Sequence, residues 1–196
     1  MPSRLLAFLF LCHCSLSLAV ENPTFSRGSV EIQVNPAKCT VQFTLGALLH
    51  TVHGTFKVSS GIIRFYPASG QASGQIAVDV RSGSTGESAR DWQMHESVLE
   101  SSRFPEAVFT MDTVTGRLAP SSESQVEVHG ALRIHGGDHE MTIPARVMVQ
   151  GDSLTATAKF KLPYVAWGMK DPSNLVLQVD KTVDVEVRLE GKFKAA

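Results

Sequence analysis

A period of two dominates this chain. In residues 30–34, for example, Val, Ile and Val alternate with Glu and Gln. Successive side chains of a β-strand point to opposite faces, so this alternation predicts strands that each have one apolar and one polar face. The pattern recurs over residues 41–45, 55–58, 62–66, 76–80, 107–111, 126–134, 141–149, 154–160 and 183–189. We therefore expect about eight to ten short strands, with a break at Ser59-Ser60-Gly61 between the third and the fourth.

The connections constrain how these strands pair. Gly136-Gly137-Asp138 and Gly151-Asp152-Ser153 are short turn sequences between alternating segments, and short turns join antiparallel neighbours. Because every strand has one apolar face, those faces must enclose a common interior. A two-sheet sandwich and a closed barrel both achieve this, and the alternation alone leaves the two open. The length of 196 residues suits one domain of either kind.

One segment is predicted to be helical, over about residues 87–101. Ser84 followed three residues later by Glu87 fits a capping box, and Phe104-Pro105 closes the segment because proline disfavours helix in the residue before it. A single short helix in an all-β chain is expected to cover an open end of the sheet. Arg90 and Asp91 are predicted to anchor this helix, each through a partner of its own.

The first residues have the pattern of a signal peptide. Arg4 supplies a positive charge, an apolar run follows over residues 5–11, and Ser17-Leu18-Ala19 offers small residues for cleavage. We expect residues 1–19 to be removed and residues 20–196 to form the mature domain, periplasmic or secreted. No later run approaches eighteen apolar residues, so no transmembrane segment is predicted.

Charge and cysteine content exclude further classes. Without Arg4 the chain has 17 basic and 19 acidic residues, a formal charge of −2. Nucleic-acid binding needs a basic patch, which this balance does not favour. Cys12 and Cys14 would leave with the signal peptide, so Cys39 would remain alone and no internal disulfide is expected.

No motif for catalysis stands out. The chain has no Gly-x-Ser-x-Gly sequence, and its acidic residues are scattered along polar faces instead of being paired in apolar surroundings. We therefore expect no enzymatic activity and no cofactor. Six histidines follow the signal peptide, and two pairs have spacings that could ligate zinc or copper, but they lie in or beside turns without an accompanying cysteine or carboxylate cluster. No metal site is predicted among them: His50, His53, His95, His129, His135 and His139.

Several short motifs resemble the YceI-like family over essentially the whole mature chain. They are Gly54-Thr55-Phe56, Gly61-Ile62-Ile63, Ser84-Thr85-Gly86, Arg90-Asp91, Met94-His95, Val98-Leu99-Glu100, Phe104-Pro105, Phe109, residues 130–136, residues 167–173 and residues 183–187. The resemblance implies an eight-stranded antiparallel lipocalin-like barrel, exported to the periplasm, that holds a long-chain amphiphilic lipid such as a polyisoprenoid or a fatty acid. It also implies that the protein has no enzymatic reaction.

A barrel of eight strands is just wide enough to be filled by side chains or to hold one slender ligand. Small inward residues mark where a tunnel could run: Ala77 or its neighbours, Ala107, Gly130, Ala145, Ala156 and Ala158. Larger residues are predicted to contact the ligand: Phe43, Phe56, Phe65, Trp92, Met94, Leu99, Phe109, Met111, Leu132, Ile134, Phe160 and Trp167. The alternative is an extracytoplasmic stress or protein-interaction module with a solid core. Homodimer formation is left open.

Overall fold

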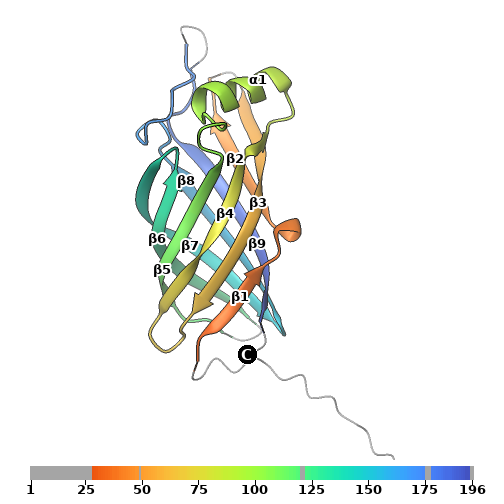
Figure 1. The fold of residues 1–196 in the computed structure, drawn as a ribbon, viewed down its shortest axis with the longest axis vertical. Helices are drawn as coiled ribbons and strands as arrows, with labels where there is room; N and C mark the ends of the chain where they lie inside the picture. The colour runs from red at the N-terminus through yellow and green to blue at the C-terminus, as the bar shows by residue number, and fades with distance from the viewer. Residues whose placement is uncertain (1–27, 49, 120–121, 175–177, 195–196) are drawn as a thin grey trace, which may run out of the picture.

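The computed structural model describes residues 28–48, 50–119, 122–174 and 178–194, which form an antiparallel β-barrel closed by a short helix (Figure 1). The predicted signal peptide lies outside the described residues. The strands are β1 Val30–Val34, β2 Thr40–Gly46, β3 Thr51–Phe65, β4 Gln71–Ser84, β5 Glu106–Gly116, β6 Glu123–Ile134, β7 Gly137–Gln150, β8 Ser153–Leu162 and β9 Val183–Phe193. Their positions confirm the strands predicted from the alternation, except that the segments predicted at residues 55–58 and 62–66 belong to the single strand β3.

The pairing of β2 with β9 closes the sheet into a ring. From β3 to β9 each strand pairs with the next along the chain, and β2 then pairs with both β3 and β9. Eight strand positions therefore form a complete ring, and the fold is the closed eight-stranded barrel that the family resemblance implied. A closed ring leaves no edge strand unpaired.

The first position of the ring is shared by two strands. β1 pairs with the C-terminal parts of β3 and β9, and β2 pairs with the other parts of the same two strands. The 3₁₀ turn η1, Pro36–Lys38, separates them, and the Asn35 side chain accepts a hydrogen bond from the Ala37 backbone N–H. Proline at the start of the turn cannot donate to the ladder, which is one reason why the strand is interrupted there.

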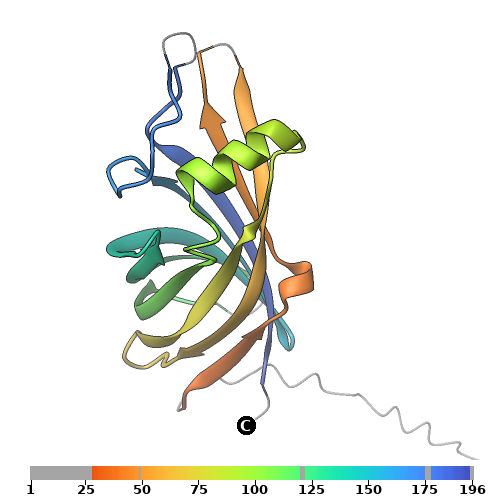
Figure 2. The same cartoon turned by 45° about the horizontal axis from the view of Figure 1, so that its top comes forward.

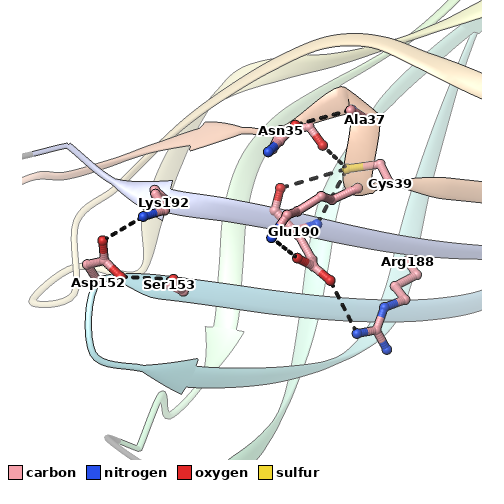
Figure 3. A network of polar contacts seen from close by, with 9 residues as sticks. Asn35, Ala37, Cys39, Asp152, Ser153, Arg188, Glu190 and Lys192 are labelled. Carbon is pink, nitrogen blue, oxygen red and sulfur yellow. Dashed lines mark hydrogen bonds and ion pairs between the residues drawn. The ribbon is translucent and has the colours of Figure 1, made fainter.

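Cys39 connects the segment between β1 and β2 to β9 through hydrogen bonds (Figure 3). Its thiol donates to the Asn35 carbonyl oxygen at 3.1 Å, and its sulfur accepts from the Glu190 backbone N–H at 3.4 Å. Burial raises the pKa of the Cys39 thiol, so it remains protonated at neutral pH. Cys39 is a free cysteine, and its contacts give it a structural place in the wall.

β3 runs unbroken through the segment where a break was predicted. The pairing of β3 with β4 shifts register between Val58 and Ser60, which marks a β-bulge. The bulge reverses which residues face inward: Phe56 and Val58 precede it on the cavity side, and Ile63 and Phe65 follow it. The expected break was wrong because a bulge changes the parity of a strand without ending it.

The helix is shorter than predicted and has two parts. α1, Ser88–Gln93, continues as one π-helical segment, η2, Met94–Val98. Glu87 caps the N-terminus through its own side chain, which accepts from the backbone N–H groups of Ala89 and Arg90. The predicted capping box at Ser84 was wrong, because Ser84 still belongs to β4. The helix lies across one end of the barrel (Figure 2).

The buried core follows the inward faces of the strands. Its buried members include Ile32, Val58, Val80 and Val149, each at most 5% exposed. None of the large side chains among the described residues is less than 2% exposed. No helix in the described ranges has the length and apolar content needed to cross a membrane.

Candidate functional site

The barrel interior contains an elongated cavity of about 330 Å³. This volume is at the lower end of the range of roughly 300–1,000 Å³ found for ligand sites. Its wall is formed by side chains from all nine strands and from the helix segment. The interior is therefore hollow, which differs from the solid core of the alternative hypothesis.

The cavity extends along most of the barrel. On β3 its wall includes both Phe56 and Phe65, which are nine residues apart, or about 30 Å along the strand at ~3.3 Å per residue. Ile32 of β1 lines it towards one end, and Met94 of the helix lines it at the other. A long and narrow space of this kind suits an extended chain better than a compact molecule.

Small side chains on β7 and β8 leave part of this space open. Ala145 lies opposite Ala158, and Ala156 lies beside it on β8; all three line the cavity, as does Ala107. Alanine contributes only one methyl group, so these positions cannot fill the interior. The expectation that small inward residues border a tunnel is met at these four positions.

The other two small residues do not line the cavity. Ala77 has the opposite parity to Ile76 and Val78, which do line it. Gly130 is covered by the Phe109 ring, whose nearest atom would lie 2.9 Å from a Cβ at this position. Its backbone also approaches Thr110 closely, so any larger residue there would collide with the neighbouring strand.

Ten of the twelve residues predicted to contact a ligand lie on the cavity wall. They are Phe43, Phe56, Phe65, Met94, Leu99, Phe109, Met111, Leu132, Ile134 and Phe160. Those on the strands alternate with outward-facing residues, as the period of two predicts. Met94 and Leu99 reach the cavity from the helix end, together with Val98, which was not predicted.

Trp92 lies outside the cavity, contrary to the prediction that it faces the ligand. Its side chain is 67% exposed. Trp92 and Met94 are two residues apart, about 200° around a helix of 3.6 residues per turn, so both cannot point into the same cavity. The helix faces the interior with Met94, and Trp92 consequently faces solvent.

Trp167 is also absent from the cavity wall. Its ring stacks on that of His139, with centroids 4.0 Å apart and planes inclined by 7°. The loop that follows β8 instead contributes Tyr164 and Met169 to the cavity. Sequence reasoning missed both, although Tyr164 continues the inward parity of Phe160 and Leu162 and could have been found from it.

Among the described residues that line the cavity, Tyr164 alone has an ionisable side chain. Its hydroxyl donates to the Asp180 backbone oxygen at 2.8 Å. Burial, with the nearby carboxylates of Asp171 and Asp180, raises the pKa of Tyr164 to about 12, so the group is neutral at physiological pH. A wall without charge offers no acid–base pair. The affinity of the cavity for a ligand would come from apolar contact.

Arg90 and Asp91 hold the start of the helix against the end of β4. Asp91 accepts hydrogen bonds from the Thr85 backbone N–H at 2.7 Å, from the Thr85 hydroxyl and from the Ser84 hydroxyl at 3.1 Å. Arg90 Nε donates to the Thr85 hydroxyl oxygen at 2.8 Å. The two residues share Thr85, and the expectation of separate partners was wrong.

These contacts change the acidity of Asp91. Burial alone would raise the pKa of Asp91, but the hydrogen bonds from Thr85 and Ser84 favour the charged form and leave the pKa below its usual value. The carboxylate is therefore fully charged at neutral pH. Its role in the geometry is to fix where the chain turns from strand into helix.

The end of the helix is attached at two further points. His95 lies between Ser101 and the Gly83 carbonyl oxygen, with Nδ1 3.0 Å from the Ser101 hydroxyl and Nε2 2.9 Å from the carbonyl. A carbonyl can only accept, so Nε2 carries the hydrogen and Nδ1 accepts from the serine. Both ring nitrogens are therefore engaged within the protein.

Glu100 and His135 form the second attachment. Glu100 Oε2 lies 3.0 Å from His135 Nε2 but not in hydrogen-bond geometry, so this contact is electrostatic. The His135 ring packs against Phe104 with centroids 4.5 Å apart. Glu100 and His135 are also the two non-glycine residues in the described ranges that have positive φ, at 45° and 50°. His135 and Gly136 form the two-residue turn between β6 and β7, one position earlier than predicted.

The remaining histidines are dispersed over the surface of the barrel. His53 lies 3.1 Å from the Thr44 hydroxyl, and His129 lies 2.9 Å from Asp112. His50 lies between β2 and β3. Among the residues that the structure describes, no three His, Cys, Asp or Glu side chains come together as a metal site would require.

The family model of the YceI-like domain matches residues 32–191. Comparison with curated proteins finds no significant match. The solved structures that are similar in fold include the following three, each at 23% identity or less. BcnA of Burkholderia cenocepacia is 23% identical, with a TM-score of 0.65 over 80% of this chain and 98% of that one.

The other two are more distant in sequence. A polyisoprenoid binding domain from Saccharophagus degradans, described as implicated in plant cell wall breakdown, is 16% identical with a TM-score of 0.68, over 83% of this chain and 98% of that one. The YCEI protein of Campylobacter jejuni is 17% identical with a TM-score of 0.59, over 76% and 88%. The family model extends from β1 to β9 and so includes every strand of the barrel. The chain belongs to the YceI-like family.

Proposed function

We propose that this protein is an exported, non-enzymatic binding protein that holds one long-chain amphiphilic lipid, a polyisoprenoid or a fatty-acid-like molecule, inside the barrel for storage or transport. The observation that supports this most strongly is the long cavity with an uncharged, almost wholly apolar wall. The description of one structural neighbour as a polyisoprenoid binding domain points in the same direction. Export follows from the predicted signal peptide.

The energetics favour a chain over a compact ligand. Each buried methylene contributes about 0.8 kcal/mol, so ten of them would contribute about 8 kcal/mol before the ligand and protein lose conformational freedom. The wall provides no cluster of polar groups that could orient a compact polar molecule. Affinity would therefore increase with the length of the hydrocarbon chain.

The test is to identify what the purified protein carries. Native mass spectrometry and organic extraction should release a long-chain amphiphile in about stoichiometric amount. Ala158→Phe places a ring in the cavity and should reduce the extracted lipid severalfold. Thr157→Phe is the matched control, because Thr157 alternates with the cavity-lining Ala156 and Ala158 and faces outward. Repeated recovery of folded protein without lipid, even after incubation with polyisoprenoids and fatty acids, would contradict the proposal.

A further inference from the structure

Two large apolar side chains are exposed at the helix end of the barrel. Trp92 on α1 is 67% exposed, and Leu48, in the connection between β2 and β3, is 71% exposed. The β2–β3 connection and the helix lie at the same end of the molecule (Figure 1). In the described part of the chain the other two exposed large apolar residues are Ile62, at 50%, and Tyr66, at 40%, which belong to the opposite end of β3 or follow it.

The helix that carries Trp92 has two apolar sides with different surroundings. Its inner side contributes Met94, Val98 and Leu99 to the cavity wall. Its outer side exposes Trp92, about 200° around the helix from Met94. One short element thus separates the apolar interior from an exposed aromatic residue.

This element is held less firmly than the strands. Neither α1 nor η2 contains a buried residue. Its polar attachments run through Asp91 to Thr85, through His95 to Gly83 and through Glu100 to His135. Segments with few buried apolar contacts open at low free-energy cost, and a π-helical turn often occurs at functional positions.

A lipid carrier must also exchange its ligand. A hydrocarbon chain that leaves the cavity through water exposes its methylenes, and the cost increases with every one of them. Exit beneath the helix directly into a bilayer avoids this exposure. Tryptophan is suited to such a surface because its ring is apolar and its N–H can remain hydrated at the level of the lipid headgroups.

The charges of the helix indicate which kind of bilayer it fits. Between residues 88 and 98 there are two acidic side chains, Asp91 and Glu96, against one arginine, Arg90. Arg90 is already bonded to Thr85. Recognition of anionic lipid requires a cluster of basic residues, which this element does not have. A zwitterionic surface is therefore the better match.

We propose that the helix end of the barrel docks on a zwitterionic phospholipid bilayer, with Trp92 inserted at the headgroup level and Leu48 as a second contact, so that lipid enters and leaves beneath the helix. The site of exchange rests on the proposed lipid-binding function. The docking itself can be measured separately from the cargo.

The experiment uses the purified protein and phosphatidylcholine vesicles. In the Trp167→Phe background Trp92 is the single tryptophan, and its emission should shift to shorter wavelength on vesicle addition and be quenched by brominated phosphatidylcholine. Trp92→Ser and Leu48→Ser should each lower the vesicle-bound fraction in a flotation assay, by at least about fivefold for Trp92→Ser. Ile62→Ser is the matched control, since it removes an exposed apolar side chain at the far end.

The outcomes distinguish docking from cargo binding. Unchanged Trp92 emission, equal loss in Ile62→Ser, or binding only to anionic vesicles would overturn the docking proposal even if extracted protein contains lipid. A dimer that Trp92→Ser dissociates in sedimentation, without vesicle binding, would overturn it in favour of a second copy of the chain. Vesicle binding through Trp92 by protein that never carries lipid would support docking and contradict the proposed function.

Discussion

At the scale of single residues, Asp91 determines where the strand β4 ends and the helix begins. Its carboxylate accepts hydrogen bonds from the Thr85 backbone, the Thr85 hydroxyl and the Ser84 hydroxyl. Arg90 Nε also donates a hydrogen bond to the Thr85 hydroxyl oxygen. The arrangement joins an exposed helix to a rigid strand through polar contacts, with no fully buried apolar residue on the helix.

Asp91→Asn should destabilise the protein by about 1 kcal/mol, because hydrogen bonds to a charged acceptor are stronger than those to a neutral one and this site is partly solvated. The pKa of Asp91 is lowered in the folded state. Its contribution is therefore present above the usual carboxyl pKa of about 3.9 and is lost as the pH falls through the lower folded value. Chemical denaturation of both proteins between pH 7 and pH 2 measures this.

Glu96→Gln provides the control for that experiment. It removes a carboxylate from the same helix, and Glu96 has no hydrogen bond or ion pair with another of the described residues. Its stability should follow the wild type at every pH. A difference between Asp91→Asn and wild type that persisted undiminished at pH 2 would mean that the charge of Asp91 is not the cause.

The sequence predicted the cavity wall well on the strands, in part on the helix, where Met94 and Leu99 line the cavity but Trp92 does not, and not in the loop after β8. Inward positions such as Phe43 and Phe160 follow from alternation alone. The apolar character of Trp92 does not show which way its side chain points. Only one side of a helix faces the interior, and which residues lie on that side depends on how the helix is rotated about its axis. Trp167 lies in a loop, where the side chains follow no regular alternation. Its stacking partner His139 belongs to β7.

At the scale of the elements, the helix ends on a residue in an unusual conformation. Glu100 follows the last helical residues with φ of 45°, a left-handed position that glycine normally occupies after a helix. Its carboxylate faces His135, which has positive φ as well. A contact between two such residues indicates that the attachment of the helix to the β6–β7 turn is maintained against backbone strain.

Comparing Glu100→Ala with Glu100→Gly separates the contact from the strain. Both variants lose the contact with His135, and only glycine relieves the left-handed backbone. Glu100→Gly should therefore be more stable than Glu100→Ala by about 1 kcal/mol, or roughly 2–4 °C in melting temperature. Amide hydrogen exchange in residues 94–99 should be faster in both variants than in the wild type.

Arg103→Ala is the control for this pair. Arg103 lies 3.9 Å from Glu100, with a side chain that is 73% exposed, and such ion pairs contribute little. Amide hydrogen exchange in residues 94–99 of this variant should remain close to that of the wild type. If Glu100→Ala left exchange in residues 94–99 unchanged, the helix would be held by His95 and Asp91 alone.

At the scale of the whole molecule, closure of the barrel is the feature that alternation could not predict. Each strand reveals its inward face, but a sandwich and a barrel use the same faces. The difference depends on pairings between β3 and β4 and between β2 and β9, and the second joins segments about 140 residues apart. Resemblance to a family provided that information, and the split of one strand position into β1 and β2 remained unpredicted.

The split position makes β1 essential to closure. β1 fills the gap between β3 and β9 below the 3₁₀ turn, and its Ile32 and Val34 are each 5% exposed. Burial of two such side chains contributes about 3–6 kcal/mol, a large part of the roughly 5–15 kcal/mol by which a typical domain is stable. Without β1 the facing edges of β3 and β9 would also be unpaired, and exposed edges promote association between chains.

A mature chain that starts at Asn35 should therefore melt at a much lower temperature, lose any lipid and form oligomers, as measured by calorimetry, extraction and light scattering. Glu31→Gln is the control, because Glu31 bonds Arg64 and Lys194 on the outer surface of the same strand while leaving its backbone pairing intact. These exposed ion pairs are expected to contribute little, so this variant should remain monomeric and retain its cargo. Equal losses in the two proteins would mean that surface charge holds the barrel closed at this position; wild-type behaviour of the truncated chain would mean that β2 alone closes it.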